Sequence, residues 1–267
     1  MGCMTSDIER MKVCLNGERG QAEHPRVPLT PAELARAAES SVAAGAEAIH
    51  LHPRDSGGAE SLAAADVGAA VAAVRAACPG VPVGVSTGLW IAGGDPHARA
   101  AAVAGWAGLA AGRPDFASVN VSEAGWAELS AALHSAGIGT EAGVWSVADA
   151  RALATFRPAN PVLRILVEVN EGPAATAPER ADDILRELDR AGAVEPRLLH
   201  GEQDTCWALI AHAGALGLAS RIGLEDTITG PYGEAVAGNA DLVRMGLTTW
   251  RSAAPRRPRR GTALSDG

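Results

Sequence analysis

The chain has 267 residues, of which 47% are hydrophobic and 20% are charged, and its formal net charge is −8. This length and composition suit one large α/β domain with a full hydrophobic core. The negative charge argues against nonspecific nucleic-acid binding, which requires a basic surface. Apolar stretches are interrupted every few residues by Arg, Asp, Glu or Pro, so neither a signal peptide nor a membrane span is predicted. We expect a soluble protein.

Cysteine and lysine usage narrows the chemistry. The four cysteines, Cys3, Cys14, Cys78 and Cys206, are scattered and form no CxxC pair, so we expect no disulfide framework, no thiolate zinc site and a reducing, cytoplasmic location. The single lysine, Lys12, falls at the start of the first predicted strand. That end of a barrel carries no chemistry, which argues against Schiff-base catalysis.

Short β-branched or apolar runs alternate with Ala-rich helical stretches along the chain. The first strand is predicted at residues 12–15, and a helix opens at Pro31, with Thr30 and Glu33 as a capping box, and stops at Gly45. Further strands are predicted at residues 46–52, 81–86, 116–121, 139–144, 162–168, 197–200 and 221–225, and further helices at residues 62–77, 96–110, 125–135, 147–156, 178–191, 205–216 and 239–250. Strands alternating with helices predict a parallel sheet, and about eight such units close a (β/α)₈ TIM barrel.

An open, doubly wound sheet is the competing architecture. It favours a glycine-rich dinucleotide loop after the first strand, and residues 16–20 lack the GxGxxG spacing. We therefore expect a single barrel domain at residues 1–253, followed by a basic tail at residues 254–267. Five arginines lie in or just before this tail: Arg251, Arg256, Arg257, Arg259 and Arg260. We expect them in a solvated, disordered terminus, and contact with a phosphate-rich cofactor such as coenzyme A is the alternative.

Polar residues at the carboxyl ends of the strands mark the candidate site, because a parallel barrel carries its chemistry there. His50 and His52 end the second strand, and side chains at i and i+2 point to the same face. Two imidazoles can chelate one Zn²⁺ ion, and Glu225 at the end of the eighth strand supplies a third ligand. A pair of hydrogen-bonded core histidines, and a helix cap or solvated loop for Glu225 and Asp226, are the alternatives.

Other strand ends carry weaker signals. Glu141 on the fifth strand can orient a ligand, act as a base or form a structural salt bridge. His200 after the seventh strand can contact substrate or be structural, and Glu168 carries less information. The third and fourth strands end in residues whose hydroxyl, amide and backbone N–H groups suit a substrate carboxylate or an ordinary turn. These residues are Ser86, Thr87, Gly88, Ser118 and Asn120.

These segments resemble a known family, the β-keto acid cleavage enzymes. The resemblance rests on residues 49–55 (IHLHPRD), 86–88 (STG) and 221–226 (RIGLED), with Asn120, Asn239 and Ala240, and it runs over nearly the whole chain. It implies a zinc-dependent (β/α)₈ barrel that condenses a β-keto acid with acetyl-CoA and releases acetoacetate and a new acyl-CoA. It also implies a homo-oligomer, a dimer or tetramer.

The resemblance also implies roles for individual residues. His50, His52 and Glu225 match the metal ligands, and Arg221 and Asp226 match the catalytic pair, in which Asp226 takes a proton from C2 of the substrate. Glu141 matches a glutamate near the metal, and Ser86, Ser118 and Asn120 lie where the family binds the substrate carboxylate. Either Glu18 or Arg19 faces the acyl chain, and Arg19 in that place predicts a neutral or anionic chain.

Two other function classes stay open. A metal-dependent hydrolase or class II aldolase can use the same ion to activate water or an enediolate. Hydrolases with an HxH motif generally carry it on the first strand with further histidines, whereas here it lies on the second with only His200 later. A non-catalytic binding protein that kept the barrel is the second alternative.

Overall fold

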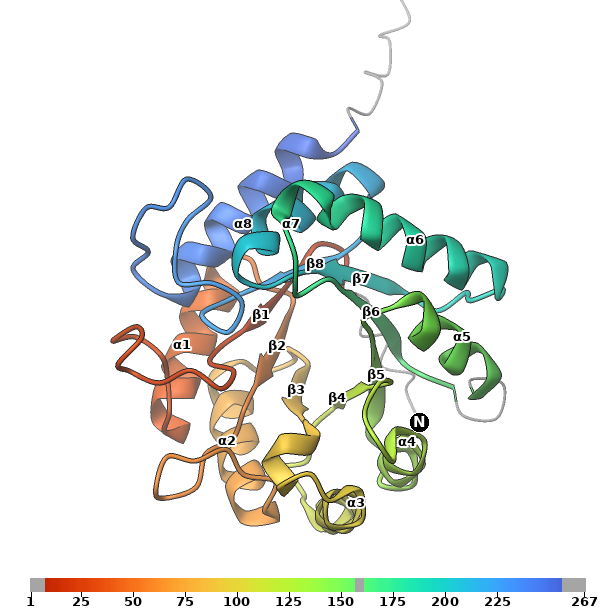
Figure 1. Ribbon diagram of the computed structural model, residues 1–267. Helices are drawn as coiled ribbons and strands as arrows, with labels where there is room; N and C mark the ends of the chain where they lie inside the picture. The colour runs from red at the N-terminus through yellow and green to blue at the C-terminus, as the bar shows by residue number, and fades with distance from the viewer. Residues whose placement is uncertain (1–7, 157–160, 256–267) are drawn as a thin grey trace, which may run out of the picture.

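Eight parallel strands form one sheet in the computed structural model, which describes residues 8–156 and 161–255. The strands follow one another in the order β7-β6-β5-β4-β3-β2-β1-β8. Their bounds are β1 (Met11–Cys14), β2 (Ala48–Leu51), β3 (Val83–Ser86), β4 (Phe116–Asn120), β5 (Gly139–Val144), β6 (Arg164–Glu168), β7 (Arg197–His200) and β8 (Ser220–Ile222). They form a ring at the centre of the molecule, with the helices around it (Figure 1).

The ring closes between β7 and β8. A parallel bridge joins Leu198 to Ala219, and the amide of Leu199 donates to the carbonyl of Ala219 at 2.9 Å. The hydroxyl of Ser220 donates to the carbonyl of Leu199 at 2.8 Å. The predicted (β/α)₈ TIM barrel is therefore confirmed.

Eight α-helices in the described residues connect the strands and cover the ring. They are α1 (Pro31–Ala43), α2 (Ala64–Ala77), α3 (Pro96–Ala104), α4 (Trp126–Ser135), α5 (Val147–Phe156), α6 (Ala177–Arg190), α7 (Cys206–Leu216) and α8 (Asn239–Ala253). Short 3₁₀ helices lie at Leu89–Ala92, Gly105–Gly108, Ala174–Thr176 and Gln203–Thr205. Across residues 8–156 and 161–255, no helix has the length and hydropathy needed to cross a membrane.

The predicted capping box of α1 is confirmed. The amide of Glu33 donates to Thr30 Oγ1 at 3.3 Å, and the amide of Thr30 donates to Glu33 Oε2 at 3.0 Å. Both contacts satisfy amides that the first turn of a helix leaves without intrahelical partners.

Several predicted element bounds are off by one or two residues, and three ends are off by three or more. The predicted helix at residues 96–110 stops at Ala104, and a 3₁₀ turn follows, in which the indole of buried Trp106 donates to the carbonyl of Leu62 at 2.9 Å. The eighth strand ends at Ile222, because the amide of Asp226 turns back to the carbonyl of Gly223 at 2.9 Å. Arg251 lies in α8, not in a tail. The remaining arginines of the predicted tail lie outside the described residues.

A buried ion-pair cluster fills the barrel beneath its mouth. Lys12 Nζ lies 2.6 Å from Glu141 Oε2, and Arg164 pairs with the other oxygen of Glu141. All three side chains are buried. Since Lys12 and Arg164 lie near the amino ends of β1 and β6, the cluster forms a layer below the carboxyl ends of the strands.

Candidate metal centre and active site

A cavity of about 470 Å³ opens at the carboxyl ends of the strands. Every strand or the loop after it contributes to its wall, as expected for the active-site face of a barrel. The lining residues are Gly17, Glu18, Arg19, Glu23, His50, His52, Ser86, Trp90, Ser118, Asn120, Trp145, Glu168, Asn170, Glu202, Gln203, Arg221 and Glu225.

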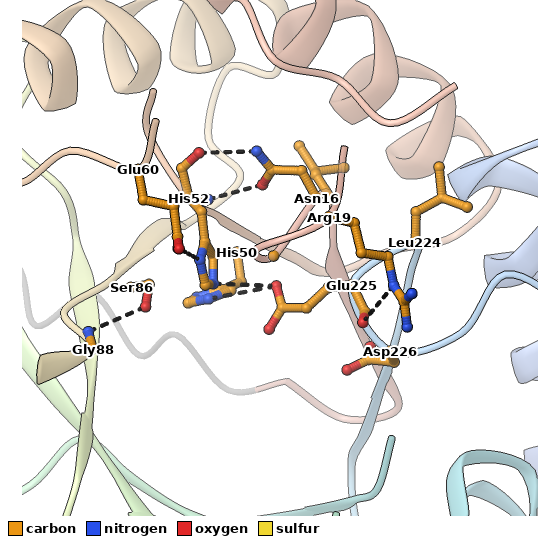
Figure 2. Close-up of polar contacts among 12 residues, drawn as sticks. Asn16, Arg19, His50, His52, Glu60, Ser86, Gly88, Leu224, Glu225 and Asp226 are labelled. Carbon is orange, nitrogen blue, oxygen red and sulfur yellow. Dashed lines mark hydrogen bonds and ion pairs between the residues drawn. The ribbon is translucent and has the colours of Figure 1, made fainter. Parts of the chain in front are cut away.

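His50, His52 and Glu225 converge on one point of this cavity. The Nε2 atoms of His50 and His52 lie 3.7 and 3.5 Å from Glu225 Oε2, and one donor atom from each residue falls within 4.8 Å of the others. Figure 2 shows both rings directed at the carboxylate. Tetrahedral Zn²⁺ with ligand distances of about 2.0–2.2 Å separates its ligand atoms by about 3.3–3.6 Å. The three side chains therefore fit such an ion, and the buried Glu225 Oε2 has no hydrogen-bond partner within the described residues.

A second group of possible ligands shares Glu225 with Cys14 and Asp226. Burial raises the pKa of the Cys14 thiol and of the Asp226 carboxyl well above their ordinary values. These shifts oppose metal binding, because metal ligands must be deprotonated, and Arg221 Nη2 already lies 2.8 Å from Asp226 Oδ1. This group therefore fits a metal ion less well than His50, His52 and Glu225.

Two features of the chain bring the ligands together. Asn16 clamps the backbone of His52, accepting from its amide and donating to its carbonyl, both at 2.9 Å (Figure 2). Gly223 lets the turn after β8 lie directly on β1, because a Cβ at this position would overlap the carbonyl of Cys14. The amide of Glu225 donates to that same carbonyl at 3.3 Å.

The outer face of His52 is held by Glu60. Its Oε1 lies 2.5 Å from His52 Nδ1, and its Oε2 accepts from the indole of Trp90 at 2.9 Å. The Trp90 ring also stacks on His52, with centroids 6.5 Å apart. Burial lowers the pKa of His52, but the carboxylates of Glu225 and Glu60 outweigh it and raise this pKa to about 9. For His50 burial dominates, so its pKa lies well below the usual value and the imidazole is neutral.

Arg221 gathers three carboxylates beside the ligands. Its Nη2 lies 2.8 Å from Asp226 Oδ1, 3.0 Å from Glu225 Oε1 and 3.1 Å from Glu202 Oε1. Its Nε donates to Asp226 Oδ1 at 2.9 Å. Asp226 is fully buried and does not line the cavity, whereas Glu202 does.

Glu202 is the carboxyl of this group that combines a raised pKa with access to the cavity. Burial raises its pKa, the charge of Arg221 lowers it, and the carboxylates of Glu225 and Glu168 raise it again, to about 7. A carboxyl that titrates near neutral pH suits proton transfer.

Ser86, Ser118 and Asn120, predicted to bind the substrate carboxylate, line the cavity together. Thr87 and Gly88 do not. The Thr87 hydroxyl is buried and donates to the carbonyl of Ser118, and the amide of Gly88 donates to Ser86 Oγ at 3.3 Å. These two residues position the neighbouring serines.

Glu18 and Arg19 both line the cavity. Glu18 is exposed at the rim, whereas Arg19 is buried. The guanidinium of Arg19 donates to the carbonyl of Glu225 at 3.3 Å and pairs with Glu23 at 2.8 Å. Arg19 thus brings a paired charge to the cavity wall.

Glu141 does not line the cavity. Both of its oxygens are held by Lys12 and Arg164 in the layer below. This placement corresponds to the salt-bridge alternative and differs from the position near the metal that the family resemblance implies.

The far wall contains residues that carried little or no signal in the sequence. Trp145 donates to Glu168 Oε2 at 2.9 Å, and His200 Nε2 lies 3.5 Å from Glu168 Oε1. Burial and the charge of Arg221 lower the pKa of His200 to about 4, so His200 is neutral. Asn170 completes this wall. A position at a strand end marked Glu168 and could have marked Glu202, but no spacing marks Trp90 in the 3₁₀ helix after β3 or Trp145 in the loop after β5.

The fold and site define a class of protein, a (β/α)₈ barrel with a cluster of two histidines and a glutamate at its mouth that could hold a metal ion. The family model of the beta-keto acid cleavage enzyme matches residues 11–254. The chain therefore belongs to the beta-keto acid cleavage enzyme family.

One relative matches a quarter of the chain, and two solved structures share its fold. The chain is 43% identical over 67 residues to the 3-keto-5-aminohexanoate cleavage enzyme of Fusobacterium nucleatum, a match that spans 25% of each chain. The solved structure of ObcA in ternary complex with a C4-CoA adduct and oxalate superposes with a TM-score of 0.68 at 18% identity, over 82% of this chain and 62% of ObcA. Thiamine phosphate pyrophosphorylase from Pyrococcus furiosus shares the fold, with a TM-score of 0.56 at 10% identity over 92% and 98% of the two chains.

Proposed function

We propose that the protein is a zinc-dependent enzyme that condenses a β-keto acid with acetyl-CoA and releases acetoacetate and a new acyl-CoA. The observation that carries this proposal is the convergence of His50, His52 and Glu225 on one point of the cavity, beside Arg221 and its carboxylates. Two nitrogen donors and one carboxylate oxygen are a ligand set that catalytic zinc uses. When bound there, the ion would polarise the 3-keto oxygen and so acidify the protons on C2.

The substrate carboxylate is assigned to the β3 and β4 side of the cavity. Ser86, Ser118 and Asn120 line this side and offer hydroxyl and amide donors. The amide nitrogen of Asn120 also donates to Glu123 Oε1 at 2.9 Å, which fixes its orientation. Binding at these residues holds the keto group toward His50 and His52, because β2 adjoins β3.

The reaction then proceeds by carbon–carbon bond exchange. The C2 carbanion adds to the thioester carbonyl of acetyl-CoA and expels the CoA thiolate. The thiolate adds to the former keto carbon, and cleavage of the C2–C3 bond releases acyl-CoA and acetoacetate. The C4-CoA adduct of ObcA is a precedent for CoA chemistry on this fold.

The acyl chain of the substrate is proposed to be neutral or anionic. Arg19 lines the cavity and forms an ion pair with Glu23. Glu18, in contrast, is exposed at the rim of the cavity. A preference for an amino-bearing chain in a substrate panel would refute this choice.

We further propose that the enzyme works in the cytoplasm, as one catalytic domain at residues 1–253. The buried cysteines Cys14, Cys78 and Cys206 are free thiols, which suits a reducing compartment. Homo-oligomeric assembly, as a dimer or tetramer, stays a prediction from the family.

The test is incubation of the metal-loaded protein with acetyl-CoA and a panel of β-keto acids that differ in charge and chain length. Mass spectrometry measures acetoacetate and the new acyl-CoA, and His50→Ala is the control. Both products are expected with the wild type and neither with the variant. No product from any keto acid, with metal bound, contradicts the proposal and favours a hydrolase or aldolase.

A further inference from the structure

We propose that Glu123 makes the active site selective for a substrate carboxylate, because it holds the side-chain amide of Asn120 with its nitrogen available to the ligand. This inference rests on the proposed function and names the residue that makes the β3 and β4 side of the cavity specific for an acid. Neither Glu123 nor its partner Arg99 lines the cavity, so both act as positioning residues.

The orientation of the Asn120 amide depends on two carboxylates. Its Nδ2 donates to Glu123 Oε1 at 2.9 Å. Its Oδ1 lies over Gly143 of β5, where a Cβ would come within 2.8 Å of Oδ1 and 3.0 Å of Glu168 Oε1. An amide turned by half a rotation would place its nitrogen on the side of Glu168 instead. That rotation would also bring Oδ1 against Glu123 Oε1, and two acceptors repel each other. Glu123 therefore decides which orientation Asn120 adopts.

This orientation presents a donor to the ligand. The amide nitrogen carries two hydrogens, and Glu123 accepts one of them. The second remains for a ligand in the cavity that Asn120 lines. Ser86 is prepared in the same sense, because its Oγ accepts from the amide of Gly88 at 3.3 Å and its hydroxyl hydrogen can then donate to a ligand. A carboxylate accepts at both oxygens, whereas a carboxamide of the same shape presents an NH₂ group at one position. The subsite therefore favours an acid over its amide.

Glu123 is itself held in place by its other oxygen. Oε2 pairs with Arg99 and accepts from the backbone amide of Leu89 at 3.2 Å. The side chains of Arg99 and Glu123 are 0% and 12% exposed, so solvent ions screen the pair little. Arg99 also donates to the carbonyls of Thr87 and Ala124 at 3.3 and 2.6 Å. One buried ion pair thus connects the segment after β3 to the loop after β4.

The local backbone brings the pair beside Asn120. The amide of Glu123 donates to the carbonyl of Asn120 at 3.1 Å, and this turn brings the two side chains together. Gly125 has a φ of 72°, and a Cβ there would lie 2.6 Å from Cβ of Pro96, so the loop packs directly on the first turn of α3. Arg99 follows three residues after Pro96. Its charge offsets that of Glu123, which permits a carboxylate so close to a subsite for an anion.

Binding of acetoacetate and acetoacetamide to the metal-loaded protein tests the selectivity without turnover, and isothermal titration calorimetry measures both dissociation constants. Acetoacetate is the proposed product, and acetoacetamide has the same shape with an amide in place of the carboxylate. We expect the wild type to bind the acid about 10-fold or more tightly than the amide, the value of one hydrogen bond to a charged group. In Glu123→Gln the new NH₂ group can donate to Oδ1 of Asn120, so the turned amide is permitted and a ratio of about 3 or less is expected.

Matched variants separate this role from a structural one. Glu128→Gln, which changes an exposed acid of α4, is expected to keep the wild-type ratio. Asn120→Ala is expected to lower the ratio by itself, and Glu123→Gln added to it should change the ratio no further, because Glu123 acts through the amide. Arg99→Gln combined with Glu123→Gln leaves no unpaired buried charge. The same lowered ratio is expected in this variant, which decides the matter if Glu123→Gln alone does not fold.

The outcomes distinguish this inference from the proposed function. A wild-type ratio in folded Glu123→Gln, or an equal drop in the ratio when Asn120 is already Ala, overturns the role of Glu123 and leaves the proposed function in place. A wild type that binds neither compound, or binds both equally, overturns the inference together with the assignment of the substrate carboxylate to this side of the cavity. Selective binding of acetoacetate by a wild type that forms no acyl-CoA contradicts the proposed reaction and leaves Glu123 as the selectivity residue.

Discussion

Glu60 Oε1 lies 2.5 Å from Nδ1 of His52, on the side of the imidazole that faces away from Glu225. A carboxylate in this position fixes the tautomer and the orientation of a metal-binding histidine and raises its basicity. Figure 2 shows Glu60 and Glu225 on opposite sides of the ring. Glu60 comes from the loop between β2 and α2 and was not marked by any sequence pattern.

Glu60→Gln is expected to weaken zinc binding by about 10- to 100-fold, because the variant removes the charge that orients His52. Titration against a competing chelator measures this affinity. Trp90→Phe is the matched control, since it removes the indole contact to Glu60 and keeps the carboxylate on His52. Equal zinc affinities for wild type and Glu60→Gln would rule out this role.

Gly223→Ala is expected to abolish zinc binding at stoichiometric concentration. The added Cβ would overlap the carbonyl of Cys14, so the turn that carries Glu225 must move away from β1. Metal analysis after gel filtration measures the bound zinc. Gly108→Ala, where a Cβ meets nothing within 4 Å, is expected to bind zinc as the wild type does, and full occupancy in Gly223→Ala would contradict the geometry of the turn.

Glu141→Gln is expected to lower the free energy of unfolding by about 3–5 kcal/mol, the cost of leaving buried charges without their partner. Lys12 and Arg164 both pair with this carboxylate inside the barrel. Urea unfolding of the metal-free protein measures the change. Asp183→Asn is the surface control, because Asp183 and its partner Arg186 are both exposed, and a change of about 1 kcal/mol or less is expected there. Unchanged stability with lost turnover in Glu141→Gln would restore the catalytic role that the resemblance implies.

The pH dependence of kcat/KM is expected to follow Glu202. Its pKa is raised to about 7, so the carboxyl is protonated below that pH and loses its ion pair with Arg221. Four groups set this pKa besides burial: Arg221 and His52 lower it, and Glu225 and Glu168 raise it. A bound cation lowers it further. We therefore expect kcat/KM to rise with pH up to a limb at or below about 7 and to level off above it. Glu202→Asp should shift this limb; an identical limb in the variant would assign it to another group.

The sequence predicted the parts of the site that depend on local periodicity. The i and i+2 spacing of His50, in β2, and His52, just after it, predicts that both side chains point to one side, and the alternation of strands and helices predicts that β8 returns to β1 beside them. Glu225 was expected within the eighth strand, but the hydrogen bonds to the Gly223 carbonyl end that strand early. Glu225 still lies near His50 and His52, because the turn that carries it folds onto β1.

Other parts of the site depend on contacts between distant segments. Glu202 meets Arg221 only because the barrel closes between β7 and β8. Trp90 comes from the 3₁₀ helix after β3 and Trp145 from the loop after β5, and no periodic pattern specifies the conformation of such connections. Thr87 is a hydroxyl-bearing residue next to the cavity-lining Ser86, yet its hydroxyl donates to the Ser118 carbonyl. Such orientations follow from packing and not from spacing.

The most direct test of the proposed reaction is an isotope experiment with acetyl-CoA that carries ¹³C at both acetyl carbons. Incubation with an unlabelled β-keto acid and metal-loaded protein is followed by NMR and mass spectrometry. We predict acetoacetate labelled at its keto and methyl carbons only, together with an unlabelled acyl-CoA. Labelled acetate, unlabelled acetoacetate or label in the acyl group would contradict carbon–carbon bond exchange at this site.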